Sequence, residues 1–365
     1  MIPTIISQKY EILGQIGRGG MGIVYQARHL ILDTLLVIKV LPPDLAQNLD
    51  LVVRFHREAR VMARLEHHHI VPVLDIDRHE GLHYFVMKYI QGKNLGQYLR
   101  DRGPLPLMKA LEIAHQVALA LEYAHNHELS VIHRDIKPSN ILIEDSTGRA
   151  LVTDFGIAKL KGGDDPTRTG FMVGTIKYCA PEQTRKDPRL DGRVDVYSLG
   201  LVMYEMVVGR SFFEGLDEQA IISKVLYEPG ENFPSFPYPL PSDFVTIVTR
   251  AIAKDPEHRY LTAATLRADI EACLARHRKE EIAGPTLLAT EILVAAPASP
   301  PKAEGTPSPK VGDQQGSTLS PGSEERRRWR SWMPHLRLRV SIALSVALAV
   351  ILSWFLLRGF LIPPL

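Results

Sequence analysis

The sequence predicts an α+β fold in which strands come first and helices follow. Short alternating or β-branched runs near the N-terminus, such as Gly22–Ala27 and Leu35–Val40, are typical of strands. The later segment Leu107–His127 carries apolar residues at helical spacing, which predicts a helix that faces a core. The folded part therefore extends from Tyr10 to about Arg278, with its β-rich portion before its helical portion.

The composition is that of a folded globular protein with a sizeable core, at 45% hydrophobic and 23% charged residues in a chain of 365. That length suits about two domains, or one bilobal domain of about 260 residues. The formal net charge of +2 is too small to indicate a nucleic-acid partner. The two cysteines, Cys179 and Cys273, show no metal-ligand spacing and suit a reducing cytosolic compartment. Residues 1–7 do not have the pattern of a signal peptide.

A glycine-rich loop between two strand-like runs consists of Ile16, Gly17, Arg18, Gly19, Gly20, Met21, Gly22, Ile23 and Val24. Glycines let the backbone approach phosphate oxygens closely and present N–H groups to negative charge. By itself the pattern also fits a plain tight hairpin. A dinucleotide-binding loop would open a helix, whereas here the β-branched run Ile23–Tyr25 follows. The sequence therefore favours a hairpin that covers a phosphate.

A lysine interrupts an apolar strand fifteen residues beyond Val24, at Lys39 in the run Leu36–Val40. Taken alone, such a lysine would be a solvated residue at the edge of a strand. The amphipathic helix that follows carries Glu58, an acid that is able to meet it. A Lys–Glu pair of this kind fixes the ammonium group where it can hold the α- and β-phosphates of a nucleotide.

The run Val131–Leu142, with Asp154 fourteen residues after Asn140, provides the groups that phosphoryl transfer needs. That reaction depends on positioning, metal ions and charge neutralisation. Asp135 can accept the proton of a substrate hydroxyl, and Lys137 can neutralise the γ-phosphate. Asn140 and Asp154 supply hard oxygen ligands for Mg²⁺.

These motifs, in this order, resemble the eukaryotic-like protein kinases, and specifically their bacterial membrane-associated serine/threonine branch. The resemblance covers residues 10–274 and implies a bilobal protein kinase fold with ATP bound between the lobes. The N-lobe, about residues 10–88, would hold a five-stranded antiparallel sheet and one helix. The C-lobe, about residues 92–274, would be mainly helical. Other motifs that carry the resemblance are the hinge Met87–Ile90, Gly174-Thr175, Ala180–Glu182, Asp195–Gly200 and Lys254–Tyr260.

The resemblance also implies which residues bind the nucleotide. Met87 would be the gatekeeper beside the adenine pocket, and Leu142 would pack under the adenine ring. Lys88 and Ile90 would offer backbone hydrogen bonds to adenine. The cofactors would be ATP and Mg²⁺, with Mn²⁺ as an alternative metal. Val37 departs from the family pattern, which has alanine there, and its added bulk narrows the expected pocket.

Two structural contacts follow from the same resemblance. Glu182 is expected to form a buried ion pair with Arg259. Asp195 is expected to brace the backbone of the catalytic loop from the central helix of the C-lobe.

Serine/threonine specificity is implied by Lys137 together with Gly174 and Thr175. Thr175 is expected to contact Asp135 and Lys137 and so to help position the substrate. The expected partners are protein substrates that present Ser or Thr.

Regulation is implied by Arg134, which directly precedes Asp135, as in kinases that are switched by activation-loop phosphorylation. The loop contains Thr167 and Thr169, and we expect autophosphorylation at one or both, since a phosphate could order the loop through Arg134. The alternative is that both are ordinary loop threonines. The resemblance leaves open a homodimer for trans-autophosphorylation.

The composition changes after the kinase-like region, and residues 275–339 read as a linker. Gly284–Ser323 holds seven prolines, five glycines and five serines in forty residues, which predicts disorder. The uncharged run Val340–Leu357 would make a helix of about 27 Å, close to the ~30 Å hydrocarbon core. Six arginines in Glu324–Arg339 precede it. We therefore expect a single-pass anchor in the cell (inner) membrane, a cytoplasmic kinase domain and a short extracytoplasmic tail at 358–365. The alternative is a helix buried against the domain or a partner.

Two other function classes are compatible with a kinase-like fold. A small-molecule phosphotransferase of the same fold would lack the peptide-positioning elements at Gly174-Thr175 and Ala180–Glu182, and both are present. A pseudokinase would need damage among the key polar residues, all of which are intact: Lys39, Glu58, Asp135, Asn140 and Asp154.

The run His67–His69 invites a metal-binding interpretation. Consecutive histidines in a turn do not converge well on one ion, so a structural loop is expected there.

Overall fold

The structure, a computed structural model, describes residues 3–19, 22–155, 176–228 and 236–283. The chain divides into two compact units, residues 1–295 and 296–365, and the described residues all belong to the first. Several predictions of the sequence analysis fall outside the described residues. They concern Gly20, Met21, Gly156, Thr167, Thr169, Gly174, Thr175, the linker from residue 284 onward and the hydrophobic run 340–357.

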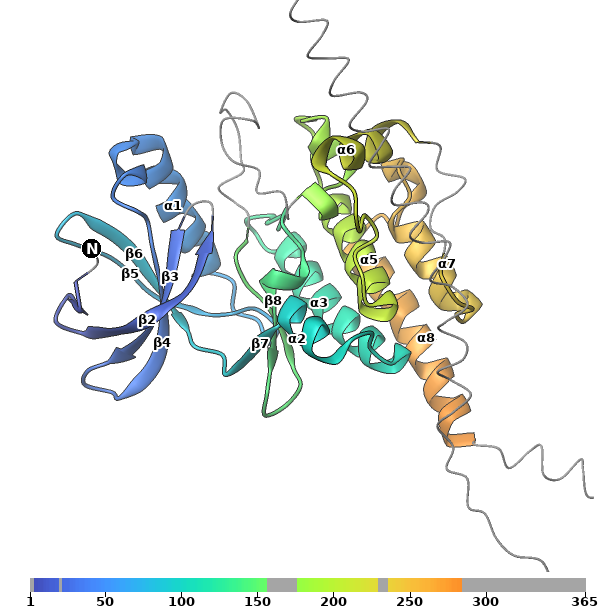
Figure 1. Cartoon of the computed structure of the whole chain (residues 1–365), viewed down its shortest axis with the longest axis horizontal. Coiled ribbons are helices and arrows are strands. Elements are labelled where there is room, and N and C mark those ends of the chain that lie inside the picture. Colours follow the sequence, from blue (N-terminus) through green and yellow to red (C-terminus); the bar gives the residue numbers. More distant parts are fainter. Residues whose placement is uncertain (1–2, 20–21, 156–175, 229–235, 284–365) are drawn as a thin grey trace, which may run out of the picture. The chain divides into compact units, whose positions relative to one another are not determined.

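The β-rich half of the described unit is one antiparallel sheet with the strand order β1-β2-β3-β4-β6-β5 (Figure 1). The strands are β1 (Ile5–Ile6), β2 (Tyr10–Gly19), β3 (Gly22–His29), β4 (Thr34–Val40), β5 (Val73–His79) and β6 (Leu82–Lys88). Between β4 and β5 the chain forms α1 (Leu49–Met62), which Asn48 caps by accepting from the backbone N–H groups of Asp50 and Leu51. Figure 1 shows α1 beside the sheet, where it contacts β5.

The sheet has six strands where the sequence analysis predicts five. The additional strand β1 is only two residues long and pairs with the start of β2, with Ile6 opposite Tyr10. Ser7 and Gln8 reverse the chain between them in left-handed backbone conformations. Ile6 is fully buried in the apolar cluster on that side of the sheet, so burial of one isoleucine holds the short edge strand in place.

The remaining described elements are mainly helical. They comprise α2 (Leu95–Arg102), α3 (Leu107–Asn126), α4 (Pro181–Thr184), α5 (Arg193–Val208), α6 (Glu218–Tyr227), α7 (Ser242–Ala251) and α8 (Ala263–Ala283), with a small three-stranded sheet of β7 (Gly92–Asn94), β8 (Ile141–Glu144) and β9 (Ala150–Val152). The sequence places the predicted helix at 107–127 almost to the residue.

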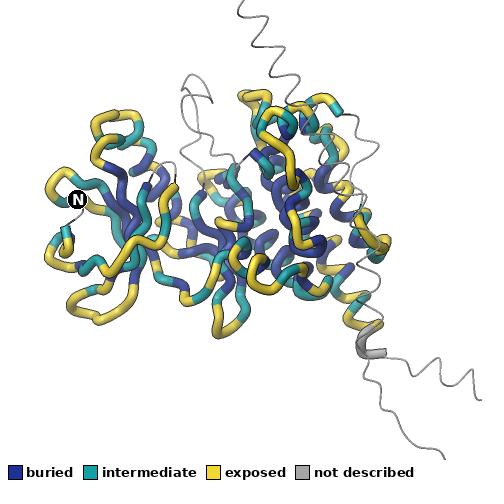
Figure 2. The backbone as a smooth tube through the Cα atoms, viewed as in Figure 1, coloured by how far each residue is buried: buried dark blue, intermediate teal, exposed yellow. Residues whose placement is uncertain are grey.

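The core of this half is built on α3 and α5, which contact each other. Most of α5 is buried, whereas α3 alternates buried with half-buried residues (Figure 2). Helix α5 is buried nearly all round, because its sequence is apolar on every face. Helix α8 packs along α3, and α7 contacts both α5 and α8. This arrangement confirms a bilobal fold with a sheet-containing N-lobe and a mainly helical C-lobe.

Helix α8 continues through Ala283 and so passes residue 275, at which the sequence analysis begins the linker. Good helix-forming residues after that point and the pair His277–Glu280, three residues apart, support the extra turns. Within the described ranges, none of the helices combines the length and the apolar character that crossing a membrane requires.

Candidate active site

The ammonium group of Lys39, on β4, lies between Glu58 of α1 and Asp154, which follows β9. On β4, Lys39 is opposite Val24 of β3 and Phe85 of β6. Its Nζ atom lies 2.9 Å from Glu58 Oε1 on α1 and 2.8 Å from Asp154 Oδ1. Lys39 is 8% exposed and Glu58 4% exposed. Burial acts to lower the pKa of Lys39, but the carboxylates of Asp154 and Glu58 outweigh it and hold that pKa above its usual value, so the lysine stays charged.

Close packing around Lys39 accounts for one glycine of the glycine-rich loop. A Cβ atom added to Gly22 would lie 3.1 Å from Cγ of Lys39 and 3.2 Å from the carbonyl oxygen of Val40. A larger residue at position 22 would require these neighbours to shift by a few tenths of an ångström. The glycine therefore permits the close approach of the lysine side chain.

The catalytic segment holds Asp135 between two donors. Lys137 Nζ lies 2.8 Å from Asp135 Oδ2, and Asn140 Nδ2 donates to the same oxygen at 3.0 Å. Asn140 Nδ2 also donates to the backbone carbonyl of Asp135 at 2.9 Å. Because Pro138–Asn140 forms a short 3₁₀ turn, both donors return to the carboxylate from within five residues. This fixes the orientation of the Asp135 carboxylate.

The backbone of this segment is held by Asp195 of α5, which confirms the expected brace. The two oxygens of its carboxylate accept hydrogen bonds from the N–H groups of His133 and Arg134, both at 2.7 Å. Oδ2 also bonds to His125 Nε2 at 2.8 Å. Burial opposes ionisation of Asp195, yet these hydrogen bonds and the nearby histidines hold its pKa below the usual value.

The brace stabilises an unusual backbone conformation at Arg134. Its φ is +64°, in the left-handed region that side chains rarely adopt, at a cost of about 1–3 kcal/mol. Asp154 has a similar φ of +56°. Both strained residues belong to the candidate site, which is where such strain commonly occurs.

Asp154 is brought to Asn140 by the small sheet. Strand β8 begins directly after Asn140 and pairs with β9, which ends two residues before Asp154. The N–H of Thr153 donates to the carbonyl oxygen of Asn140 at 3.0 Å and fixes the two segments together. His133 is fully buried, and its ring lies 4.5 Å from that of Phe155. The fold thus brings together two motifs that the sequence analysis identified separately, one around Asn140 and one around Asp154.

The side-chain oxygens of Asn140 and Asp154 suit a hard cation such as Mg²⁺. The Nδ2 atom of Asn140 is used by Asp135, so the amide presents its oxygen Oδ1, which accepts a long hydrogen bond of 3.3 Å from Ser139. The side chain of Asp154 is 34% exposed and carries a carboxylate. An amide oxygen and an accessible carboxylate are ligands that Mg²⁺ prefers.

The residues expected around adenine lie on β4, β6 and β8, except Ile90, which follows β6. Met87 and Ile90 are buried, and Leu142 is half-buried against the core. The N–H of Lys88 donates to the carbonyl oxygen of Pro72 at 3.0 Å, so an adenine contact by Lys88 would use its own carbonyl group. Val37 lies opposite Met87 across β4 and β6. Ile16 of the glycine-rich loop, also expected to bind the nucleotide, lies on β2 and is 53% exposed.

Sequence reasoning missed three residues that support these groups. His125 binds Asp195 from the last turn of α3, and the ring of Phe85 lies 5.5 Å below the ammonium group of Lys39. Arg57 of α1 is close enough to Arg134 to disfavour its charge. Nothing in the spacing of these residues identifies them, because each meets its partner through tertiary packing or strand register.

Two structural expectations are confirmed away from the reacting groups. Glu182 accepts two hydrogen bonds from the guanidinium of Arg259, at 2.6 and 2.9 Å, and that guanidinium is fully buried. The histidine run lies in a turn, where His69 bonds the carbonyl oxygen of Ala150 at 2.9 Å. Burial lowers the pKa of both His67 and His69, as expected of structural histidines.

Comparison with known proteins places this geometry in a family. Residues 10–269 match the protein kinase domain family. The chain is 38% identical over 281 residues to the serine/threonine-protein kinase PrkC of Bacillus subtilis, covering 77% of this chain and 43% of PrkC. It is 38% identical over 274 residues to the serine/threonine-protein kinase PknB of Mycobacterium tuberculosis, covering 73% of this chain and 43% of PknB. The chain thus spans about two fifths of the length of these curated relatives.

A solved kinase-domain structure shares the fold. The crystal structure of the Mycobacterium tuberculosis PknI kinase domain superposes with a TM-score of 0.55 at 26% identity, covering 74% of this chain and 99% of that domain. The family match extends over most of the described residues and includes every residue of the Lys39–Asp135–Asp154 group. The chain therefore belongs to the protein kinase family, in its bacterial eukaryotic-like serine/threonine branch.

Proposed function

We propose that this chain transfers the γ-phosphate of ATP to serine and threonine hydroxyls of proteins. Two sets of contacts carry the proposal: Lys39 contacts Asp154, and Lys137 and Asn140 hold the carboxylate of Asp135. Every charged residue that the reaction needs is present. The names of its relatives support the specificity for serine and threonine.

The chain's own residues account for the steps of the transfer. The substrate hydroxyl oxygen attacks the γ-phosphorus, the bond to the β–γ bridging oxygen breaks, and ADP leaves. Asp135 accepts the hydroxyl proton, and Lys137 and Asn140 keep its carboxylate in one orientation for that role. Lys39, held by Glu58, binds the α- and β-phosphates and so orients the group that is transferred.

Mg²⁺ bound by Asn140 and Asp154 would neutralise negative charge on the phosphates. In the structure Lys39 contacts Asp154 directly. With nucleotide and metal bound, Lys39 would also contact the phosphates and Asp154 would also contact the metal ion. Mn²⁺ prefers the same oxygen ligands and could replace Mg²⁺.

Activation by autophosphorylation of Thr167 or Thr169 is part of the proposal. Its support lies in Arg134: burial lowers the pKa of Arg134, and the guanidinium of Arg57 lowers it further, while Asp195 acts in the opposite direction. Two neighbouring guanidinium groups attract an anion, and a phosphothreonine adds about −1.5 to −2 charge. Phosphopeptide mapping after incubation with ATP and Mg²⁺ tests this step, and a fully active chain with an unmodified loop would rule it out.

We also propose that residues 340–357 anchor the chain in the cell membrane with the kinase domain in the cytoplasm. The support is the uncharged composition of the run and the six arginines that precede it. Fractionation of cells that express the chain with and without residues 340–365 tests the proposal. Equal recovery of both forms in the membrane-free fraction would refute the anchor. The proposal of autophosphorylation at Thr167 or Thr169 includes the association of two copies, so that one phosphorylates the other.

The transfer itself is tested with γ-labelled ATP and a generic basic protein as acceptor. We expect label on serine and threonine of the acceptor with the wild-type chain, and little label with Asp135→Asn. The exposed loop acid Asp145 offers a matched control, since Asp145→Asn removes a carboxylate outside the site. Equal inertness of wild type and Asp135→Asn would favour a binding module of the same fold, and label on small metabolites alone would favour a small-molecule phosphotransferase.

A further inference from the structure

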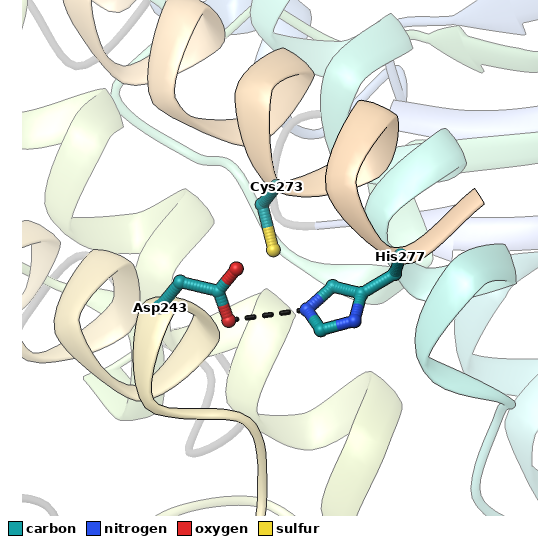
Figure 3. A group of neighbouring side chains, drawn as sticks. All are labelled: Asp243, Cys273 and His277. Carbon is teal, nitrogen blue, oxygen red and sulfur yellow. Dashed lines mark hydrogen bonds and ion pairs between the residues drawn. The ribbon is translucent and has the colours of Figure 1, made fainter. Parts of the chain in front are cut away.

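A group of side chains of the metal-ligating types lies far along the chain from the kinase site, where α7 meets α8. It consists of Asp243, Cys273 and His277 (Figure 3). Each offers one ligand atom, and these atoms all lie within 4.8 Å of one another. Asp243 Oδ1 and His277 Nε2 are 3.1 Å apart. The sequence shows no metal-ligand spacing around either cysteine; the packing of α7 on α8 brings Asp243 to Cys273 and His277.

Helix geometry explains why the cluster forms. Cys273 and His277 are four residues apart on α8, so both side chains leave the same face of that helix. Asp243 lies in the first turn of α7, which packs against α8. Figure 3 shows the thiol and the imidazole directed toward the carboxylate from successive turns of α8.

A neighbouring carboxylate completes an arrangement that is typical of metal-binding histidines. His277 Nδ1 lies 2.9 Å from Glu280 Oε2, while Nε2 faces the cluster. Metal-ligating histidines commonly donate their other ring N–H to a carboxylate, which fixes the tautomer that leaves the ligating nitrogen available. Glu280 therefore holds the imidazole with Nε2 facing the cluster. Burial acts to lower the pKa of His277, but Asp243 and Glu280 outweigh it and hold that pKa above its usual value, so a proton must leave His277 before Nε2 can coordinate an ion.

We propose that Asp243, Cys273 and His277 bind a divalent metal ion of the zinc type and join α7 to α8. One sulfur, one nitrogen and one oxygen ligand suit Zn²⁺, which is usually four-coordinate, with a water molecule as the remaining ligand. The hard-oxygen pair Asn140 and Asp154 suits Mg²⁺ instead, so the two sites select different metals.

Binding has two further costs that the structure makes visible. Burial and the Asp243 carboxylate raise the pKa of Cys273 to about 12, so the thiol proton leaves to solvent when the thiolate binds the ion. Arg276 Nη1 lies 3.0 Å from Asp243 Oδ2, and its cation competes with a metal. The Arg276 side chain is 60% exposed, however, and can move into solvent. Cys273 itself is 2% exposed, which protects the thiol from oxidation and encloses the site.

The competing interpretation is an ion-pair network without metal, formed by Asp243, Arg276 and His277. The two interpretations differ in one measurable property. A thiolate bound to Co²⁺, used as a probe in place of Zn²⁺, gives a sulfur-to-metal charge-transfer band in the near ultraviolet. The active-site ligands Asn140 and Asp154 contain no sulfur and cannot give that band.

The experiment titrates the purified 365-residue chain with Co²⁺ and then displaces it with Zn²⁺. We expect the band to saturate at about one equivalent and to disappear when Zn²⁺ is added. Cys179→Ser is the matched control, because it removes the other buried cysteine and is expected to keep the band. Cys273→Ser is expected to abolish the band, and Arg276→Ala to strengthen Co²⁺ binding several-fold.

His277→Gln and Asp243→Asn keep the thiol and are each expected to weaken Co²⁺ binding about 10-fold or more. They decide the matter if Cys273→Ser fails to fold, as judged by circular dichroism. No charge-transfer band in the wild-type chain would overturn the proposal in favour of the ion-pair network. A band that survives in Cys273→Ser and is lost in Cys179→Ser would overturn it in favour of a site at the other cysteine. Kinase activity does not enter either readout.

Discussion

The Nζ atom of Lys39 lies 2.8 Å from Oδ1 of Asp154, so strand β4 of the N-lobe contacts the segment that follows β9. These residues are 115 positions apart in sequence. The contact closes a chain of interactions that begins at Glu58 on α1 and passes through the buried ammonium group. Displacement of α1 would therefore remove a counter-charge from Lys39 and alter its contact with Asp154.

Replacing Lys39 with methionine is expected to reduce phosphate transfer by about 10²- to 10³-fold, because the donor that holds the phosphates is lost. The same change is expected to cost about 3–5 kcal/mol of unfolding free energy, since it leaves Glu58 buried without its cation. Transfer assays and urea unfolding measure the two effects.

The double variant Lys39→Met with Glu58→Leu separates the two roles. Removing both charges is expected to recover most of the stability while the chain stays inactive. Identical stability of the single and double variants would show that the ion pair contributes nothing to the fold.

Asp195→Asn is expected to lower the unfolding free energy by about 1–3 kcal/mol, because an amide cannot accept all three N–H groups that the carboxylate accepts. The pKa of Asp195 lies below its usual value in the folded chain. Its ionised form therefore stabilises the fold above about pH 4, and this contribution is lost as the pH falls through the folded value. Unfolding at a series of pH values should show a steeper acid loss for wild type than for the variant, and parallel curves would contradict the assignment.

Glu182→Gln is expected to destabilise the chain by about 3–5 kcal/mol, because Arg259 would keep a buried charge without its carboxylate. Thermal unfolding measures the loss. The exposed pair Lys93–Asp101 is a suitable comparison, and Asp101→Asn is expected to change stability little. A similar effect of both substitutions would mean that burial does not govern the strength of these pairs.

Val37→Ala is expected to lower the KM for ATP by a few-fold, because it widens the space beside Met87, at a stability cost of about 1–2 kcal/mol. Ile38→Val is the control: Ile38 is buried in the cluster on the other face of the sheet, so it should affect stability without changing KM. Steady-state kinetics decide the point, and an unchanged KM in Val37→Ala would show that Val37 does not limit the pocket.

The reacting residues could be predicted from the sequence because the chemistry requires particular side chains at short, fixed spacings. Asp135, Lys137 and Asn140 lie within six residues, and the structure joins them through direct contacts. Lys39 and Glu58 were expected to pair because the helix that follows the strand carries an acid able to meet the lysine. Lys39 Nζ lies 2.9 Å from Glu58 Oε1.

Residues that depend on register or helix packing could not be predicted in this way. Phe85 reaches Lys39 only because β4 and β6 pair in one register, and His125 reaches Asp195 only through the packing of α3 on α5. The short strand β1 depends on the burial of Ile6, which no local pattern reveals.

The cluster at α7 and α8 illustrates the same limit. The spacing of Cys273 and His277 is visible in the sequence, but a helical pair alone is not a metal site. The third candidate ligand, Asp243, comes from another helix, and Glu280 orients His277 only because α8 extends beyond residue 274, where the resemblance to kinases ends.

Single-turnover phosphate transfer, measured beside ATP affinity in the presence of Mg²⁺, distinguishes proton acceptance by Asp135 from a role in nucleotide binding. If Asp135 accepts the proton of the substrate hydroxyl, Asp135→Asn binds ATP as the wild type does but transfers phosphate about 10²- to 10⁴-fold more slowly, whereas Asp145→Asn matches the wild type. Transfer by Asp135→Asn at the wild-type rate would exclude Asp135 as the proton acceptor.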